Sequence, residues 1–315
     1  MKTVGLTSLK IEAVQGCVPA NTVDNLDLCT ELVGAAKAAA IVKSTGFSFR
    51  RVLPPGGTVL DLMLPAARRA LEGVDTTSVG GVVAVSFSSP ARFPALAVRV
   101  QQALGLPGDV AALDLQLACA GYPYGLLVAG QLAAATGRRI LLLDGDVQSA
   151  HVDVSDVGTL AVMSDAATAT LVSAAGGAPA RFAFLTDGSG GDVLACGPDG
   201  RIRMDGFGVF RFVAGPVTGF LGDFVKTLPA APDLFVPHQA NMYMVRQMAK
   251  SLGLVERLQT SGERYGNPGS CSVPLTLAAN GGTGSALLAG FGAGLAAAAA
   301  CVDIPADCRR GTQEI

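Results

Sequence analysis

Stretches rich in aliphatic and β-branched residues alternate along the chain with alanine-rich stretches, which is the pattern of an α/β protein with buried sheets. Val79–Ser86 and Ala111–Ala118 predict strands, and the second strand ends directly at Cys119. A long helix follows from about residue 120 to Thr136. The other elements predicted in this half are helices at Thr58–Leu71 and Phe93–Leu104, a strand at Arg139–Leu143, and a pair of short strands within Leu160–Ser173.

The second half of the chain follows a similar order without a visible residue-level repeat. Leu234–Pro237 predicts a short strand that ends at His238, and Asn241–Leu252 predicts an amphipathic helix. A helix at Pro216–Leu228 comes before them, and a strand and hairpin at Ser285–Ile304 close the chain. Because each half places a strand, a reactive side chain and a helix in succession, we expect a fold built from two similar halves.

The boundary between these halves is predicted just after the Leu160–Ser173 strands. It divides the chain into an N-terminal half, 1–173, and a C-terminal half, 174–315. The glycine-rich loop from Thr186 to Gly200 is the alternative boundary.

The charge and hydropathy of the chain indicate which kinds of binding partner are excluded. The 315 residues carry a formal charge of −2 with a pI of about 5.7, which offers no basic surface for nucleic acid or an anionic membrane. Ser272–Val302 contains no charged residue, but Pro274, Asn280 and six glycines favour buried structure over a membrane span. The N-terminus lacks the long apolar stretch of a signal peptide, so we expect a cytoplasmic protein.

The sequence gives little support for a metal or cofactor site. The seven cysteines form no Cys-x-x-Cys pair, and only two histidines are available, so no metal site is expected. The glycine-rich segment Gly290–Gly294 lacks the setting of a dinucleotide fingerprint, and no P-loop lysine is present. We therefore expect no cofactor. Gly290–Gly294 can form a simple turn or bulge, or can present a backbone N–H to a developing oxyanion.

Three residues are candidates for chemistry. Cys119 lies where a buried strand changes to a helix, and a helix N-terminus favours thiolate over thiol. His238 follows Pro237 at a strand end, and Asn267 lies in a Gly-Asn-Pro-Gly segment. Taken singly, each also fits a structural role: a buried cysteine, a hydrogen-bonded core histidine and a turn. Together they match a nucleophile with oriented polar partners.

These motifs resemble β-ketoacyl-acyl-carrier-protein synthase III, a condensing enzyme of the thiolase superfamily. The resemblance spans nearly the whole chain and rests on several motifs in the family's order. They are Ala118-Cys119-Ala120-Gly121, Val236-Pro237-His238-Gln239-Ala240-Asn241, Gly266-Asn267 with Ser272-Val273-Pro274, and Phe291-Gly292-x-Gly294.

The resemblance implies a thiolase-like five-layer αβαβα fold with two pseudo-duplicated halves, and a homodimer. It assigns Cys119 as the nucleophile that takes an acyl group from a thioester. His238 and Asn267 would then stabilise the enolate formed by decarboxylation of a malonyl-carrier protein, which attacks the acyl-cysteine to give a 3-oxoacyl product. The backbone N–H groups of Cys119 and Ala293 would form a second oxyanion site, and Phe93 would close the acyl pocket, often that of the partner subunit.

The chain departs from the family at three contacts to coenzyme A. The family's stacking tryptophan is replaced by Ala40, an arginine by Val157, and a basic residue is lost within Met242–Met244. At roughly 1–2 kcal/mol for each contact, coenzyme A binding should weaken by several kcal/mol. We therefore expect the acyl donor to be carried on a protein, or coenzyme A to be held differently.

An acyl carrier protein would need a basic patch for its acidic helix. Arg246, Lys250 and Arg257, on and just after the helix that follows His238, are the candidate docking residues, although an ordinary solvated face fits them as well.

Two other functions compete with decarboxylative condensation in fatty acid initiation or a specialised polyketide-like pathway. One is transfer of the acyl group from Cys119 to a hydroxyl, amine or carrier thiol without loss of carbon dioxide. The other is a non-catalytic subunit of a heterodimeric synthase. Asn267 favours condensation, because its amide donates a hydrogen bond without the charge that would repel an enolate.

Overall fold

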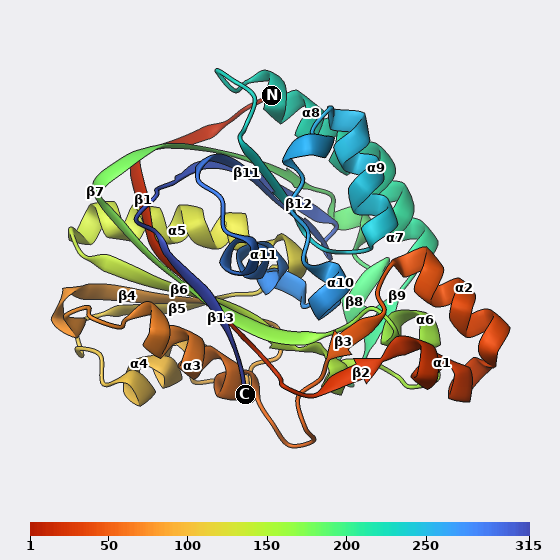
Figure 1. Ribbon diagram of the computed structural model, residues 1–315. Coiled ribbons are helices and arrows are strands. Elements are labelled where there is room, and N and C mark those ends of the chain that lie inside the picture. Colours follow the sequence, from red (N-terminus) through yellow and green to blue (C-terminus); the bar gives the residue numbers. More distant parts are fainter.

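The computed structural model describes residues 1–315 as five alternating layers of helix and sheet (Figure 1). The strands are β1 (Val4–Val18), β2 (Thr22–Asp24), β3 (Phe49–Arg51), β4 (Val79–Val85), β5 (Ala111–Leu115), β6 (Arg139–Val147), β7 (Asp165–Thr186), β8 (Leu194–Cys196), β9 (Ile202–Met204), β10 (Leu234–Pro237), β11 (Gly284–Gly292), β12 (Ala296–Ile304) and β13 (Arg309–Glu314). The helices are α1 (Asn25–Val33), α2 (Ala35–Thr45), α3 (Val59–Ala70), α4 (Leu96–Leu104), α5 (Gly121–Thr136), α6 (Val157–Leu160), α7 (Gly206–Phe212), α8 (Thr218–Lys226), α9 (Met242–Leu252), α10 (Gly262–Tyr265) and α11 (Ser272–Asn280).

The main strands follow the order β10-β11-β12-β7-β6-β4-β5, and β1 pairs with both β7 and β13. Helices α3 and α4 cover one outer face, α5 and α11 lie in the middle, and α8 and α9 cover the other outer face (Figure 1). The predicted α/β fold with five αβαβα layers is therefore confirmed.

Strand β6 shows how the sequence produces these layers. Its side chains alternate between the two faces of the sheet, as the period of a strand requires. Ile140 and Leu142 join the central core around α5, whereas Leu141 and Leu143 pack against the outer helix α3. A continuous apolar run thus supplies two different cores, which explains why the strand shows no hydrophobic alternation.

The predicted pair of short strands at Leu160–Ser173 is wrong. Helix α6 ends at Leu160, and a single long strand, β7, begins at Asp165 and continues to Thr186. Gly176 and Gly177 let β7 bend past β1: Gly176 has φ +69°, and a Cβ on Gly177 would lie 2.4 Å from the backbone of Leu9.

The strand β7 pairs with strands from both of the predicted halves. Its first part pairs with β6, and its last part, Arg181–Thr186, pairs with β12. The boundary predicted after residue 173 falls inside this strand, before its partner changes, and the division of the chain at that point stays a prediction.

Helix α4 begins at Leu96 rather than at the predicted Phe93. The carboxylate of Asp114 on β5 accepts hydrogen bonds from the backbone N–H groups of Leu96 and Ala97, at 2.6 and 2.9 Å. This long-range cap sets the start of the helix, and no local sequence signal predicts it.

One helical run, Gly206–Lys226, is long and apolar enough by composition to cross a membrane. Its middle is a π-helical segment that contains Pro216, and its buried face, with Phe220 and Phe224, packs in the apolar core between α8, α9 and the sheet. The uncharged segment Ser272–Val302 forms α11, β11 and most of β12, as expected for buried structure.

Candidate active site

The nucleophile candidate Cys119 sits at a tight turn between β5 and the central helix α5. It lies in a short 3₁₀ turn, Ala118–Ala120, that leads directly into α5. Ala118 has φ +41°, an unusual value for a residue with a side chain. Gly121 permits the turn to approach β4, because a Cβ there would lie 2.3 Å from Val85. The turn holds Cys119 at the N-terminus of α5, with 6% of its surface exposed.

The glycine-rich segment at the end of β11 passes directly over this turn. A Cβ on Gly290 would lie 2.8 Å from the carbonyl oxygen of Cys119. A Cβ on Gly292 would lie 3.0 Å from the Cβ of Cys119 and 3.5 Å from its Sγ. Only glycine therefore lets the strand approach the nucleophile this closely.

His238 follows β10, and its backbone N–H donates to the carbonyl of Ala289 over 2.7 Å. Its ring nitrogen Nδ1 lies 2.7 Å from Oγ of Ser272. That hydroxyl accepts a hydrogen bond from the N–H of Gln239 and has no other acceptor for its own proton. Ser272 therefore donates to Nδ1, which leaves the ring proton on Nε2.

Burial keeps this imidazole neutral. His238 has 2% of its surface exposed, and burial lowers its pKa from 6.5 to about 3, with a weaker opposing effect from a backbone hydrogen bond at Gly269. The ring also packs edge-on against Phe291, with centroids 5.3 Å apart. A neutral His238 whose Nε2 bears the proton is a hydrogen-bond donor at working pH.

The amide orientation of Asn267 is determined by its neighbour. Its Oδ1 accepts from the N–H of Gly269 over 3.0 Å, so Nδ2 is left as a free donor. The backbone of Asn267 is held on both sides: its N–H donates to Val162, and its carbonyl accepts from Ser164, each over 3.0 Å. The side chain is 5% exposed.

All three candidates line one cavity of about 230 Å³. A second cavity, of about 300 Å³, also opens at Cys119 and is lined by Ala293. Neither the Cys119 amide nor the Ala293 amide donates to a backbone acceptor. The site thus has one arm that contains the side-chain donors of His238 and Asn267, and another arm that contains the backbone amides of Cys119 and Ala293.

The thiol of Cys119 does not follow the sequence expectation of a favoured thiolate. Burial raises its pKa to about 12, and the nearby carboxylate of Asp146 acts in the same direction. The helix N-terminus does not outweigh the loss of solvation, so the thiol of the free protein is protonated at neutral pH.

The remaining predicted residues lie away from these cavities. Phe93 is 84% exposed and lines neither of them. Arg246 is paired with Glu263 over 2.6 Å, and Arg257 donates to a backbone carbonyl. Lys250 is exposed on α9 and forms no ion pair.

Several site residues were not singled out from the sequence. Ser272 was noted only within its motif, and its contact with His238 spans 34 positions. Asp146 binds the loop after β4 through Ser86, Phe87 and Ser88, and burial raises its pKa to about 6. The sequence signal that could have identified Asp146 is an aspartate within an otherwise apolar strand. Gln148, which contacts the Asn267 loop, had none.

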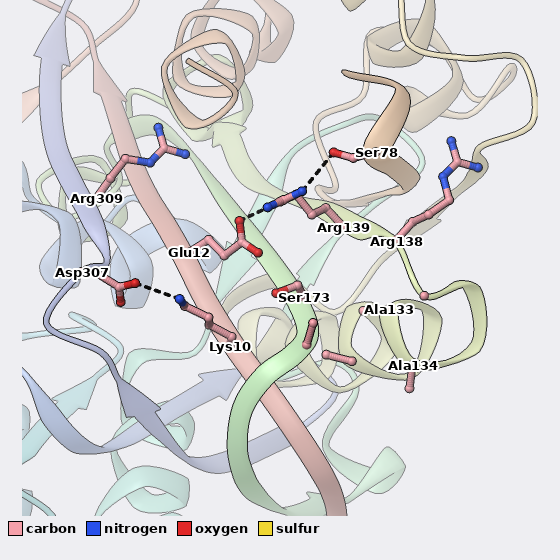
Figure 2. A pocket seen from close by; sticks show the side chains of 13 residues that line it. Lys10, Glu12, Ser78, Ala133, Ala134, Arg138, Arg139, Ser173, Asp307 and Arg309 are labelled. Carbon is pink, nitrogen blue, oxygen red and sulfur yellow. Dashed lines mark hydrogen bonds and ion pairs between the residues drawn. The ribbon is translucent and has the colours of Figure 1, made fainter. Parts of the chain in front are cut away.

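A separate cavity of about 500 Å³ is not part of this site. It lies at the other end of α5, about 24 Å along the helix from Cys119. Its charged side chains pair with one another: Lys10 with Asp307 over 2.8 Å, and Arg139 with Glu12 over 2.7 Å (Figure 2). It holds no nucleophile beside a histidine.

The fold and the Cys–His–Asn cavity define a thiolase-fold condensing enzyme. Family models described as 3-oxoacyl-[acyl-carrier-protein (ACP)] synthase III and its C-terminal region match residues 113–190 and 226–304. A β-ketoacyl-[acyl-carrier-protein] synthase III from Streptomyces coelicolor is 33% identical over 95% of this chain and 94% of its own length. The chain therefore belongs to the β-ketoacyl-[acyl-carrier-protein] synthase III family.

Solved structures agree with this assignment. A 3-oxoacyl-(acyl-carrier protein) synthase from Burkholderia xenovorans is 28% identical and superimposes with a TM-score of 0.95, covering 100% of this chain and 99% of that one. The priming β-ketosynthase of the R1128 polyketide pathway is 28% identical with a TM-score of 0.84, covering 95% and 96%. The predicted family and the predicted condensing function are confirmed.

Proposed function

We propose that this ketosynthase forms an acyl-cysteine on Cys119 and condenses it with a malonyl thioester whose enolate is stabilised by His238 and Asn267. The observation that carries the proposal is the cavity shared by the three residues, in which Nε2–H of His238 and Nδ2–H of Asn267 are the side-chain donors. The overall reaction is decarboxylative condensation in fatty acid or polyketide initiation.

In the first half-reaction, Sγ of Cys119 attacks the carbonyl carbon of the acyl thioester. The bond from that carbon to the donor sulfur breaks, and the thiol proton of Cys119 leaves with the departing thiol. Negative charge develops on the carbonyl oxygen, and the free amides of Cys119 and Ala293 are the donors that would receive it. This step therefore needs no charged base on the protein.

In the second half-reaction, the malonyl carboxylate leaves as carbon dioxide, and the electron pair of the broken carbon–carbon bond becomes an enolate. His238 and Asn267 donate to the enolate oxygen, and both are neutral, so neither binds the malonyl carboxylate as a counter-ion would. The enolate carbon then attacks the acyl-cysteine. The carbon–sulfur bond breaks, its electron pair stays on Sγ as a thiolate, and Cys119 takes up a proton from solvent.

The donor proposed for the first step is carried on an acyl carrier protein. The 230 Å³ cavity that contains the catalytic groups has no lysine or arginine in its lining, which suits an uncharged pantetheine arm better than the phosphates of free coenzyme A. Lys250 is the one predicted docking residue that is free to meet an acidic helix.

A homodimer and a cytoplasmic location complete the proposal. Phe93 exposes 84% of its surface in the loop before α4 and lines neither cavity at Cys119. A partner subunit would give this aromatic side chain an apolar environment. Its position is therefore compatible with a role in the acyl pocket of the partner.

The test measures the two half-reactions separately. Intact-protein mass spectrometry follows acylation by a panel of acyl-coenzyme A and acyl-carrier-protein donors, and ¹⁴C-labelled carbon dioxide release follows condensation with malonyl-carrier protein. We expect an acyl adduct that is absent in Cys119→Ala, formed mainly from carrier-bound donors, and acyl-dependent release of carbon dioxide. Transfer of the acyl group without carbon dioxide release would instead support simple acyl transfer.

A further inference from the structure

The cavity of about 300 Å³ that opens at Cys119 contains one deeply buried amide side chain, Gln148. Eleven of its 15 lining residues are hydrophobic, as expected of a site for an acyl chain. Gln148 directly follows β6 and has 2% of its surface exposed. A buried carboxamide in such a wall needs an explanation.

The orientation of this amide follows from its partners. Nε2 donates to the carbonyl oxygen of Ser164 over 3.0 Å and to that of Asn267 over 2.7 Å. Both partners are backbone carbonyl oxygens, so the opposite amide orientation would place Oε1 of Gln148 against two other hydrogen-bond acceptors. The NH₂ group of Gln148 therefore faces the Asn267 loop, and both of its protons are used.

The carbonyl oxygen of Gln148 is left without a partner. Oε1 accepts no hydrogen bond from any protein group. It is not among the polar atoms that the protein encloses completely, as the carboxylate of Asp144 is, so its remaining free surface faces the cavity. Gly269 packs against the amide, since a Cβ there would lie 3.2 Å from Oε1, and this contact restrains Gln148 from turning away.

We propose that Gln148 is a specificity-determining residue that selects acyl groups bearing a hydrogen-bond donor, most simply a hydroxyl. A saturated chain in this cavity would cover Oε1 without replacing its contact with water. A hydroxylated chain would donate to it. The discrimination expected when a buried acceptor gains or loses its donor is about tenfold or more.

This inference rests on the proposed acyl-cysteine and names the acyl class that forms it. Gln148 also positions the loop of Asn267, so its replacement should slow condensation for every acyl group. Acylation of Cys119 does not use Asn267. The ratio of acylation rates for two acyl groups within one variant therefore reports selection alone.

The experiment uses pairs of acyl thioesters of equal chain length, four to eight carbons, with and without a single hydroxyl placed at each position in turn. Each is supplied on pantetheine and on an acyl carrier protein, and Cys119 acylation is timed by intact mass. We expect wild type to load at least one hydroxyacyl group about tenfold faster than its unsubstituted counterpart. Gln148→Met, which keeps the length of the side chain, should remove or reverse that preference.

Gln102→Met is the matched control, because Gln102 is exposed on α4 and lines neither cavity at Cys119. It should keep the wild-type ratio. Equal loading of all pairs by wild type, or a preference that survives Gln148→Met, would overturn the inference while leaving the acyl-cysteine intact. Failure of every donor to acylate Cys119 would refute the proposed function itself.

Discussion

The replacement Asn267→Ala separates the two half-reactions most sharply. The structure gives Asn267 one free donor, Nδ2, beside the Nε2–H of His238, and both face the cavity in which the enolate would form. The acyl-transfer oxyanion relies instead on the amides of Cys119 and Ala293. Loss of Nδ2 should therefore impair condensation and spare acylation.

The expected magnitude follows from the number of donors. Removing one of two preorganised donors from an oxyanion costs about 2.7–4 kcal/mol of transition-state stabilisation, or 10²–10³ in rate. The variant also loses the acceptor for the N–H of Gly269, which should reduce the free energy of unfolding by roughly 1–3 kcal/mol. The rate effect and the stability effect are distinct, and each can be measured.

The assay compares carbon dioxide release with Cys119 acylation in the same preparation. An acylation rate close to wild type shows that the variant is folded, and the loss of carbon dioxide release then reports the enolate alone. Asn280→Ala, the same exchange at an exposed position at the end of α11, should change neither rate. Full condensation activity in Asn267→Ala with normal acylation would refute the role assigned to Nδ2.

The remaining predictions concern access to Cys119, its reactivity and the protonation of His238. Gly292→Ala should lower the acylation rate more than tenfold, because the added Cβ would lie 3.0 Å from the Cβ of Cys119. Gly219→Ala is the control, since the space around Gly219 is open, and this variant should acylate at the wild-type rate. Timed mass spectrometry measures both rates. Iodoacetamide alkylation of Cys119 should rise about tenfold per pH unit from pH 7 to 10 without levelling off, because its pKa of about 12 lies above that range; a plateau near pH 7 would contradict this. Condensation should show no transition at pH 6.5, because His238 has a pKa of about 3. The contribution of His238 to stability should fall as the pH drops from 6.5 toward 3, where the unfolded state takes up a proton on this residue that the native state does not, whereas the raised pKa of buried Asp146 acts in the opposite direction. Ser272→Ala should slow condensation about tenfold, because the ring proton of His238 is then no longer fixed on Nε2.

Local patterns were enough to identify the main chemistry and much of the fold. The strand that ends at His238 has the predicted bounds, Leu234–Pro237, and the helix after it begins one residue later than predicted because Asn241 caps it. The motifs around Cys119 and Asn267 led to the family. Each of these features depends on residues close together in the chain.

The tertiary structure decided what depends on residues far apart in the chain. Asp114 sets the start of α4 from 18 positions away, and Ser272 sets the tautomer of His238 from 34. Gln148 meets the Asn267 loop across 119 positions, and no period or motif encodes that contact. The protonation state of Cys119 likewise follows from burial, which is a property of the assembled layers. Sequence thus determined which groups can react, and packing determined their protonation, their orientation and the surfaces that they face, because desolvation and hydrogen-bond geometry arise only when distant segments meet.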